Sequence, residues 1–246
     1  MPAPRRPTTA IRIPRLFVGT SGFSYAAWRG SFYPDDLPAS KMLHFYARTF
    51  ASVEINHSFH RQPTPALLEG WARETPPGFR FALKAPQRIT HQLRLKDAAD
   101  PTLSFCTVAR RLGRRLGPLL FQLPPYLRFD AARLGEFLAI LPAGLEYAFE
   151  FRSEGWFNDE TYALLSRHRA ALCVADAETL ATPLVATAPF GYLRLRREDY
   201  ADGDIDAWAE RICATRSWKR NYVYFKHEEG ARGTMLAQAL MQRLVS

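Results

Sequence analysis

The stretch SVEINHSFH, residues 52–60, begins as a β-strand and ends in polar side chains. Side chains alternate between the two faces of a strand, so Val53 and Ile55 share one face and Glu54 and Asn56 share the other. A carboxylate on a face turned toward a protein interior needs a partner or a chemical role, because burying an unpaired charge is costly. This stretch predicts a strand whose polar end belongs to a functional site.

Seven further segments have the length and the aromatic or β-branched content of strands. They cover residues 15–20, 79–86, 117–125, 146–152, 170–176, 190–196 and 221–227. Amphipathic segments with a 3.6-residue period separate most of them, and four of these segments open on capping or first-turn residues. These openings are at Ser40, Thr64 with Pro65, Asp100 with Pro101, and Asp130.

The alternation of eight strands with seven or eight helices predicts an α/β fold, a single TIM-like (β/α)8 barrel, rather than an open doubly wound sheet. Only thirteen residues separate 170–176 from 190–196, which is near the minimum for a crossover between parallel strands. We therefore expect the sixth helix to be reduced or missing. Residues 1–15 are expected to form a disordered Pro/Arg-rich tail, and residues 16–246 to form one barrel domain.

Composition indicates a globular chain in a reducing compartment. The 246 residues are 47% apolar, which is enough for a large core, and the three cysteines are widely spaced without a CxxC motif. Free thiols of this kind predict a cytoplasmic protein. No apolar run is long enough to span a membrane, and the N-terminus lacks the apolar segment of a secretory signal. No membrane partner is therefore expected.

The formal net charge of +9 suggests an anionic partner. Four of the positive charges lie in the first fifteen residues, so the excess on the rest of the chain is modest. The run RRLGRR, residues 110–115, is most simply interpreted as the solvent-exposed side of a helix.

The polar end seen at residues 52–56 recurs at the C-terminal ends of the other predicted strands. The residues concerned are Glu54, Asn56, Lys84, Gln122, Glu150, Arg152, Asp176, Arg194, Arg196 and Lys226. Barrel enzymes place their chemistry at this end, so the ring is a candidate active site. A structural ion-pair network that fills the top of the barrel is the alternative. In that case Arg152 or Arg194 serves as a structural partner of Glu150.

Three acids and five bases give this ring a positive excess that favours an anionic guest. We interpret Glu54, Glu150 and Asp176 as acid or base candidates. Lys84 is a base or an electrostatic stabiliser, because desolvation lowers the pKa of a lysine. The arginines would clamp the anion.

The loop after the first strand and three histidines add candidate ligand contacts. Thr20 ends the segment 15–20 and Ser21 follows it, at a place where backbone N–H groups can hold an oxyanion, although a plain tight turn is the favoured interpretation. Tyr25 and Trp28 offer stacking surfaces or simply packed aromatic rings.

His57 and His60 could ligate a metal together with Glu54 or Asp176. We expect no metal or other cofactor, because Lys84 and the arginines oppose a second cation. Phosphate hydrogen bonding or proton transfer by His57, His60 or His91 is the more modest hypothesis.

Eight segments resemble the domain-of-unknown-function family 72, the YecE-like proteins. They are VGTSGFSYAAWRGSFYP, VEINHSFH, FRFALKAPQRITH, LGPLLFQLPP, AFEFRSEGWF, LCVAD, YLRLR and VYFKHEEG, in order along the chain. The resemblance implies a TIM-barrel-like fold but no established reaction. Its barrel is similar in shape to the endonuclease IV and xylose isomerase-like group, which suggests a phosphodiester or sugar substrate by analogy only.

Carried over by motif, the resemblance implies a pocket at the C-terminal mouth. Its residues would be Thr20, Ser21, Tyr25, Trp28, Glu54, Asn56, Lys84, Gln122, Glu150, Arg152, Trp156, Asp176, Arg194 and Lys226. The family often has Ser and Tyr where this chain has His57 and His60, which weakens a metal site there. Arg196 and Lys226 stand where other members carry less basic motifs, so this pocket is more basic.

Three functions follow as hypotheses. The leading one is an enzyme, a hydrolase or lyase of a phosphate ester, acting on a small phosphorylated or otherwise anionic substrate. A nucleotide or nucleic acid is an alternative substrate of this kind. The second hypothesis is a non-catalytic module that binds a nucleic acid or another anion. The third is a glycosidase or sugar isomerase, since two glutamates across a barrel can flank a glycosidic bond. Nothing in the sequence predicts an oligomeric state.

Overall fold

The computed structural model describes residues 15–227 and 229–245 of the chain. Eight parallel strands form one sheet in the order β1-β8-β7-β6-β5-β4-β3-β2. They are β1 Arg15–Thr20, β2 Ser52–Ile55, β3 Arg80–Lys84, β4 Leu116–Gln122, β5 Tyr147–Glu150, β6 Ala171–Asp176, β7 Phe190–Leu195 and β8 Arg220–Phe225. The predicted strands are therefore confirmed. The tail proposed for residues 1–15 lies outside the described residues, except for Arg15, which begins β1.

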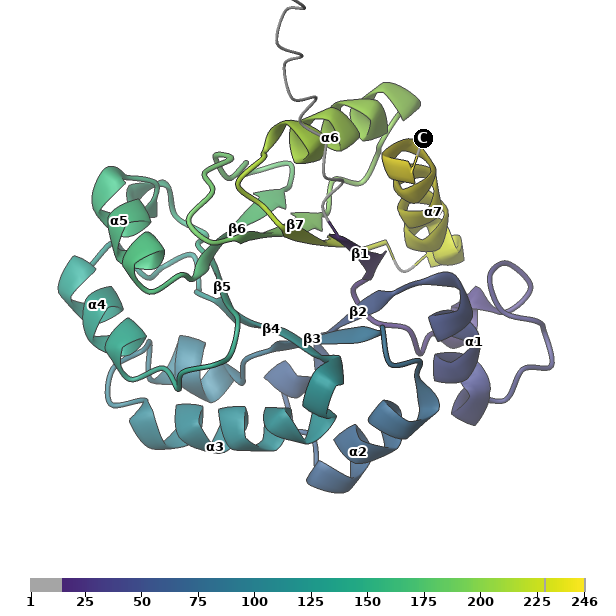
Figure 1. Ribbon diagram of the computed structural model, residues 1–246, viewed down its shortest axis with the longest axis horizontal. Helices are drawn as coiled ribbons and strands as arrows, with labels where there is room; N and C mark the ends of the chain where they lie inside the picture. Colours follow the sequence, from purple (N-terminus) through teal and green to yellow (C-terminus); the bar gives the residue numbers. More distant parts are fainter. Residues whose placement is uncertain (1–14, 228, 246) are drawn as a thin grey trace, which may run out of the picture.

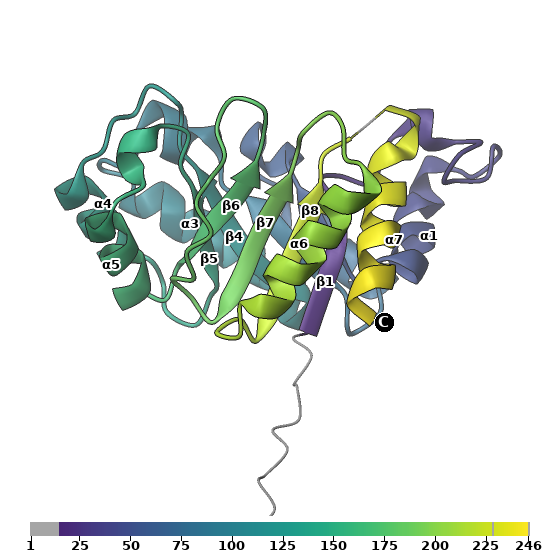
Figure 2. The same ribbon diagram turned by 90° about the horizontal axis from the view of Figure 1, so that it is seen from above.

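Helices cover the outside of the sheet, as Figures 1 and 2 show. They are α1 Met42–Thr49, α2 Pro65–Glu74, α3 Ala99–Ala109, α4 Ala131–Ala139, α5 Asp159–Arg167, α6 Asp202–Ala214 and α7 Arg232–Val245. Residues 177–189, which are all described, contain no helix. The expected loss of the sixth helix is therefore confirmed, and α6 lies between β7 and β8.

Two of the four expected helix openings act as caps. Asp100 lies in the first turn of α3, which begins at Ala99 without a side-chain cap. Thr64 and Asp130 accept backbone N–H hydrogen bonds at the starts of α2 and α4. The expected start at Ser40 is wrong, because residues 39–41 form a 3-10 turn and α1 begins at Met42. The capping residue there is Lys41, which makes no side-chain cap.

The barrel is nearly closed at the junction of β1 and β2. A single bridge pairs Ser21 with Glu54, and the N–H of Gly22 donates to the carbonyl oxygen of Glu54 at 2.8 Å. These bonds fall at the C-terminal ends of both strands. The junction therefore fixes the backbone of Glu54 where the predicted polar ring begins.

Side-chain alternation divides the core into two layers. The larger apolar cluster lies between the strands and the helices, and a smaller cluster fills the inside of the barrel. Inside, Phe17 stacks on Tyr222 with centroids 4.9 Å apart, and small residues such as Ala82 and Ala148 leave room for the rings. Toward the C-terminal ends of the strands, the inward side chains become polar.

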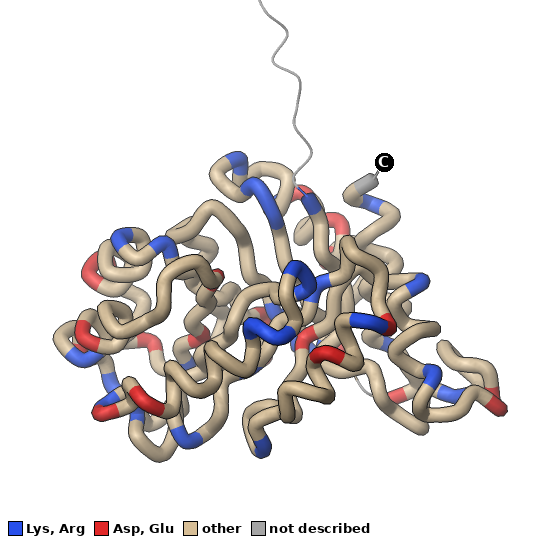
Figure 3. Tube along the Cα trace, turned by 60° about the horizontal axis from the view of Figure 1, so that its bottom comes forward, with Lys and Arg blue, Asp and Glu red and all other residues tan. Residues whose placement is uncertain are grey.

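Charged residues are spread over the whole described trace. Lys and Arg positions and Asp and Glu positions are both scattered along the described trace (Figure 3). No helix in the described part of the chain is long and apolar enough to cross a membrane.

Candidate functional site

A buried ion cluster lies on the barrel axis at the C-terminal ends of β2, β5 and β7. Arg194 donates from Nη2 to Glu54 Oε1 at 2.9 Å and from Nη1 to Glu150 Oε2 at 2.5 Å. The side chains of these three residues are at most 2% exposed. The strands bring them together because inward positions two residues apart lie on one face. This confirms the predicted convergence of Glu54, Glu150 and Arg194.

Two further hydroxyl groups saturate Glu54. Its Oε1 accepts from Ser21 Oγ at 2.6 Å, and its Oε2 accepts from Tyr192 OH at 2.7 Å. Asn56 Nδ2 adds a longer bond of 3.2 Å to Oε1. Tyr192 was not among the site residues predicted from the sequence, although it lies two residues before Arg194 and therefore shares its inward face.

The second glutamate is held by three donors. Glu150 receives Arg194 on one oxygen and Arg196 Nη2, at 3.1 Å, on the other. The side chain of Gln122 also hydrogen-bonds to it. Arg196 Nε is buried and has no hydrogen-bond partner among the described residues. An unpaired buried donor at this edge is suited to a ligand oxygen, because leaving it unsatisfied costs free energy.

Both glutamates are ionised at neutral pH. Burial by itself raises the pKa of Glu150, but the charges of Arg194 and Arg196 and two hydrogen bonds lower it to about 2. The same competition lowers the pKa of Glu54, where Arg194, Ser21 and Tyr192 outweigh burial. The two carboxylates in turn hold the pKa of Arg194 well above its ordinary value despite burial. The cluster therefore keeps its charges.

Lys84, at the end of β3, is a cation without a carboxylate partner. Its Nζ lies 3.9 Å from the centroid of the Phe59 ring and forms no ion pair within the described ranges. Burial and the neighbouring Arg194 charge lower the Lys84 pKa to about 8, although Glu150 and Glu54 oppose the shift. Lys84 can therefore exchange a proton near physiological pH.

Three more basic groups surround Lys84. His91 lies in a π-helical turn, Arg88–Gln92, with Nδ1 2.8 Å from Thr90 Oγ1. Burial and the charges of Lys84 and Arg152 lower the pKa of His91. Arg152 and Lys226 are exposed at the ends of β5 and β8, so the mouth combines a balanced buried cluster with a basic rim.

The prediction that Asp176 faces the axis is wrong. Its Oδ2 accepts from Arg197 Nε at 3.1 Å, Tyr200 OH at 2.9 Å and Trp208 Nε1 at 3.1 Å. These partners lie in α6 and the segment before it. Cys173 takes the inner face of β6, so alternation turns Asp176 outward. Its carboxylate therefore ties α6 to the sheet.

The loop after β1 does not cradle an anion. The N–H groups of Thr20, Ser21 and Gly22 donate to Tyr46 OH, the Phe225 carbonyl and the Glu54 carbonyl, respectively. The Thr20 hydroxyl is buried and donates to the Gly22 carbonyl at 2.6 Å. These backbone bonds join β1 to its neighbours in the barrel. Ser21 contributes to the site through its hydrogen bond to Glu54.

Two tryptophans expected at the pocket are part of the core. Trp28 is 1% exposed and packs on Tyr25 and Tyr33. Trp156 is fully buried, donates from Nε1 to the Leu127 carbonyl at 2.8 Å, and stacks on a neighbouring aromatic ring. Neither presents a free stacking face, because apolar side chains cover both. The packed-ring alternative therefore holds for Trp28, and Trp156, a pocket position by resemblance, lies in the core instead.

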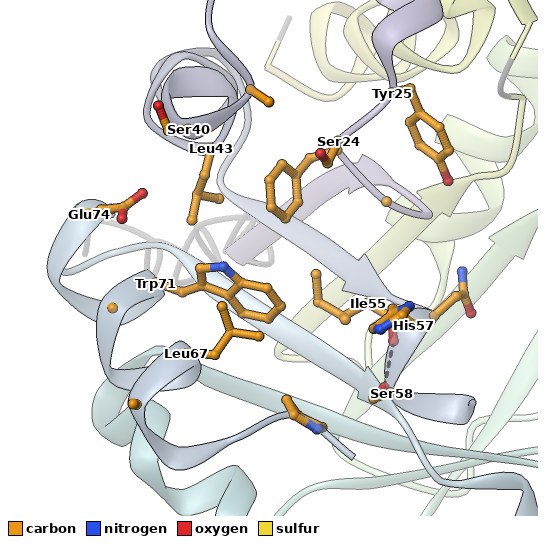
Figure 4. Close-up of a pocket in the computed structure, with 17 residues that line it drawn as sticks. Ser24, Tyr25, Ser40, Leu43, Ile55, His57, Ser58, Leu67, Trp71 and Glu74 are labelled. Atoms are coloured by element: carbon orange, nitrogen blue, oxygen red, sulfur yellow. Dashed lines mark hydrogen bonds between the residues drawn. The ribbon is translucent and has the colours of Figure 1, made fainter. Parts of the chain in front are cut away.

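A separate groove of about 700 Å³ runs beside the mouth, between α1 and α2. Figure 4 shows Leu43 of α1 facing Trp71 and Leu67 of α2, with His57 at the end nearer the strands. The groove also contains Tyr25 and Asn56. It is mainly apolar, so it differs in chemistry from the basic rim.

His57 and His60 are exposed in a 3-10 turn, His57–Phe59 and its cap, and neither ring forms an ion pair with Glu54 or Glu150 in the described part of the chain. Among the residues that the structure describes, no group of three or more His, Cys, Asp or Glu side chains is placed to hold a metal ion. Neither histidine is brought to Glu54, whose oxygens are already taken by Ser21, Asn56, Tyr192 and Arg194.

Comparison with known proteins supports the resemblance found in the sequence. The family model described as "Protein of unknown function DUF72" matches residues 17–246. The chain belongs to the DUF72 family. A DUF72 protein of Thermotoga maritima MSB8 has a similar fold, with a TM-score of 0.81, 28% identity, and coverage of 94% of this chain and 100% of that chain.

Other relatives match at lower identity or over a shorter part of the chain. A DUF72 protein of Enterococcus faecalis V583 gives a TM-score of 0.77 at 17% identity, covering 94% of this chain and 96% of that one. This match shows the fold alone. UPF0759 protein YecE of Escherichia coli K12 is 34% identical over 113 residues, which cover 46% of this chain and 42% of YecE. The chain thus matches less than half the length of YecE, and about half that of UPF0759 protein YunF of Bacillus subtilis 168, at 54%.

Proposed function

We propose that this DUF72 protein is an enzyme that acts on a small phosphorylated or otherwise anionic substrate at the C-terminal mouth of the barrel. The observation that carries the proposal is Lys84, a half-buried lysine with a lowered pKa and no ion-pair partner within the described ranges, beside a saturated ion cluster. Hydrolysis or elimination of a phosphate ester is the leading reaction class. Such a reaction needs a base and cations that stabilise developing negative charge.

The buried cluster supports the site rather than reacting in it. Each carboxylate is ionised, fully buried and saturated with donors, so Glu54 and Glu150 have no proton to give. Arg194 directs Nε, Nη1 and Nη2 at these two carboxylates. We therefore revise the acid and base roles inferred for the glutamates from the sequence. Glu54, Glu150 and Arg194 are positioning residues that fix the ends of three strands.

The anion would bind to the groups that the cluster leaves free. Arg196 keeps an unpaired buried Nε while its Nη2 is anchored on Glu150. Lys226 and Arg152 are exposed at the ends of β8 and β5. Arginine matches phosphate oxygens through parallel N–H donors, and lysine supplies a compact charge. Together these side chains can neutralise a phosphate dianion.

Lys84 would supply the reactive group. With a pKa of about 8, about one lysine in ten is neutral at pH 7. The neutral amine can act as a base or nucleophile, and the protonated form binds phosphate. His91, whose pKa is lowered by burial and by Lys84, is a neutral proton acceptor on the same rim.

A binding module without chemistry is the second candidate, because the same cations would hold an anion without a reaction. The saturation of both glutamates favours it, since no protonated carboxylic acid is available. That saturation also counts against a glycosidase, which needs one protonated and one free carboxyl group. A nucleic-acid ligand would show itself by a steep loss of affinity with salt.

The affinity of the mouth for sulfate is expected to fall about tenfold as pH rises through about 8. Lys84 loses its charge in this range, because its pKa is lowered to about 8, and one lost charge contact corresponds to about tenfold in affinity. Sulfate is the probe because its own charge is constant between pH 6.5 and 9.5. Isothermal titration calorimetry of the wild type and K84M across this range measures the effect.

K84M is expected to bind sulfate weakly at all these pH values, without the step near pH 8. A bound anion raises the pKa of Lys84, so the step moves upward as sulfate occupancy increases. A flat profile for the wild type, or the same step in K84M, would show that Lys84 does not contact the anion.

A further inference from the structure

A hollow of about 550 Å³ lies at the end of the barrel opposite the mouth. Five arginines line it: Arg15, Arg80, Arg110, Arg114 and Arg220. Three of them begin strands β1, β3 and β8, at the strand ends farthest from the arrowheads in Figure 2. In barrel folds this face usually contributes stability rather than chemistry, so a concentration of five cations here requires an explanation.

Four of the five arginines of this hollow have no carboxylate partner among the described residues. Glu146 is the one carboxylate among the described lining residues. Arg220 pairs with its Oε1, and Tyr222 OH donates to its Oε2 at 3.0 Å. No ion pair holds the other four arginines in the parts of the chain that the structure describes. Burial lowers the pKa of Arg80, and the charges of Arg15 and Arg220 lower it further.

An aromatic floor holds two of these guanidinium groups in place. The guanidinium carbons of Arg15 and Arg80 lie 5.2 and 5.4 Å from the centroid of the Phe17 ring. Phe17 in turn stacks on Tyr222 inside the barrel. Cation–π contacts orient a guanidinium without consuming its N–H donors. Arg80 uses Nη1 for the carbonyl oxygens of Pro77 and Phe79, and Arg110 uses Nη2 for that of Ala143. The hollow thus presents oriented guanidinium groups whose remaining N–H donors can meet a ligand.

The run RRLGRR supplies the opposite wall. The expected solvent exposure is confirmed for Arg110, Arg111 and Arg114. The segment is not one regular helix face, because Arg110–Arg115 is a 3-10 segment that Gly113 breaks with φ 55° and ψ −129°. Arg111 pairs with Glu69 at 3.6 Å and Arg115 donates to the Thr75 carbonyl at 2.8 Å. Both therefore lie outside the hollow. Arg110 and Arg114 line it instead.

We propose that this hollow binds a small ligand that carries two or more phosphate groups. Four guanidinium groups without a carboxylate partner among the described residues exceed the charge of a single phosphate, and guanidinium N–H donors bind phosphate oxygens well. The volume of about 550 Å³ is in the range of pockets for small ligands. A nucleic acid fits less well, because basic and acidic positions are mixed over the rest of the trace (Figure 3).

The test is calorimetric titration of the full chain with inorganic triphosphate at about 0.15 M salt. The double variant R15Q/R114Q removes two exposed arginines that have no ion pair among the described residues. It is expected to weaken triphosphate binding about 100-fold, at about tenfold for each lost charged contact. R167Q, an equal charge change at an exposed position on α5 outside the hollow, is the matched control and should stay within about twofold of the wild type.

Thermal unfolding checks that each variant is folded, and the single reversal R114E provides a second route if the double variant is unstable. K84M should not change the affinity of the hollow for triphosphate, because Lys84 does not line it. The proposal for the hollow and the proposal for the mouth can therefore fail independently. Unchanged affinity in R15Q/R114Q and in R114E would overturn the proposal. The proposal would also be overturned if R167Q weakened triphosphate binding as much as R15Q/R114Q does. Tighter, steeply salt-dependent binding of a single-stranded oligonucleotide, lost in R15Q/R114Q, would replace it with a nucleic-acid site.

Discussion

Replacing Arg194 with Met lowers the free energy of unfolding by about 3–5 kcal/mol at pH 7, because removing one partner of a buried ion pair leaves uncompensated charge. Arg194 contacts both Glu54 and Glu150, and none of the three side chains is more than 2% exposed. In R194M both carboxylates stay buried without the guanidinium group that they share. Glu54 then keeps only hydroxyl and amide donors, and Glu150 keeps Arg196 as its charged partner. Urea denaturation of the wild type and R194M measures the difference.

The pH dependence identifies the cause of this loss. In the wild type the Glu150 pKa is lowered to about 2, so its stabilising effect is complete above its ordinary pKa and is lost only as pH falls toward 2. Without Arg194, burial dominates and raises the pKa of both glutamates. The folded variant then takes up protons more readily than the unfolded chain, and its stability rises as pH falls. The difference in the free energy of unfolding between the wild type and R194M is therefore expected to become smaller as the pH falls from 7 to 5.

The triple variant R194M/E54Q/E150Q is the matched control, because it removes all three charges. It should recover part of the stability lost in R194M, since neutral replacement of a buried ion cluster is often tolerated. R196M, which removes one contact at 3.1 Å from a side chain 18% exposed, should cost less than R194M. If R194M lowered the free energy of unfolding by less than about 1 kcal/mol, as for an exposed ion pair, this would contradict the stabilising role of the buried ion cluster.

K84M is expected to reduce turnover of a phosphate ester by about 10²–10³-fold, the usual cost of removing one group that stabilises developing charge. The side chain is half-buried against Phe59 with a pKa of about 8, so Met can take its place without leaving a buried charge. The assay uses p-nitrophenyl phosphate and a panel of sugar and nucleoside phosphates, and follows kcat and KM separately.

K84R distinguishes a base from a clamp. Arginine keeps the positive charge but does not release its proton, so K84R should retain sulfate affinity and lose turnover. If no phosphate ester in the panel is turned over by the wild type, although sulfate binding depends on Lys84, the protein is a binding module. If K84M and the wild type turn over a substrate equally, Lys84 has no catalytic part.

Hydrophobic periodicity was sufficient to predict the barrel. The switch between a two-residue and a 3.6-residue hydrophobic period identified all eight strands. The short connection at residues 177–189 predicted that no helix lies between β6 and β7. Parity within a strand then placed Glu54, Lys84, Glu150 and Arg194 at one end, because backbone geometry fixes the direction of each side chain. These predictions concern regular segments, where local sequence determines direction.

The errors fall where that regularity ends. The register of β6 turns Asp176 outward to α6, and an apolar strand with a single polar residue at its end gave no second polar position to show its parity. Trp28 and Trp156 follow strands in loops without a period, and long-range packing buries them in the core. Tyr192 shares the parity of Arg194 but carries no charge, so a search for ionisable ends passed over it.

A crystal soaked in phosphate at pH 7 tests most directly whether the mouth of the barrel is an anion site. We predict phosphate density in hydrogen-bond contact with Lys84 Nζ and with the Nε of Arg196, which has no partner among the described residues. The cluster of Glu54, Arg194 and Glu150 should lie unchanged beneath it. Clear density elsewhere on the protein, with no density at the mouth and with Lys84 Nζ still resting on the Phe59 ring, would contradict the proposed site.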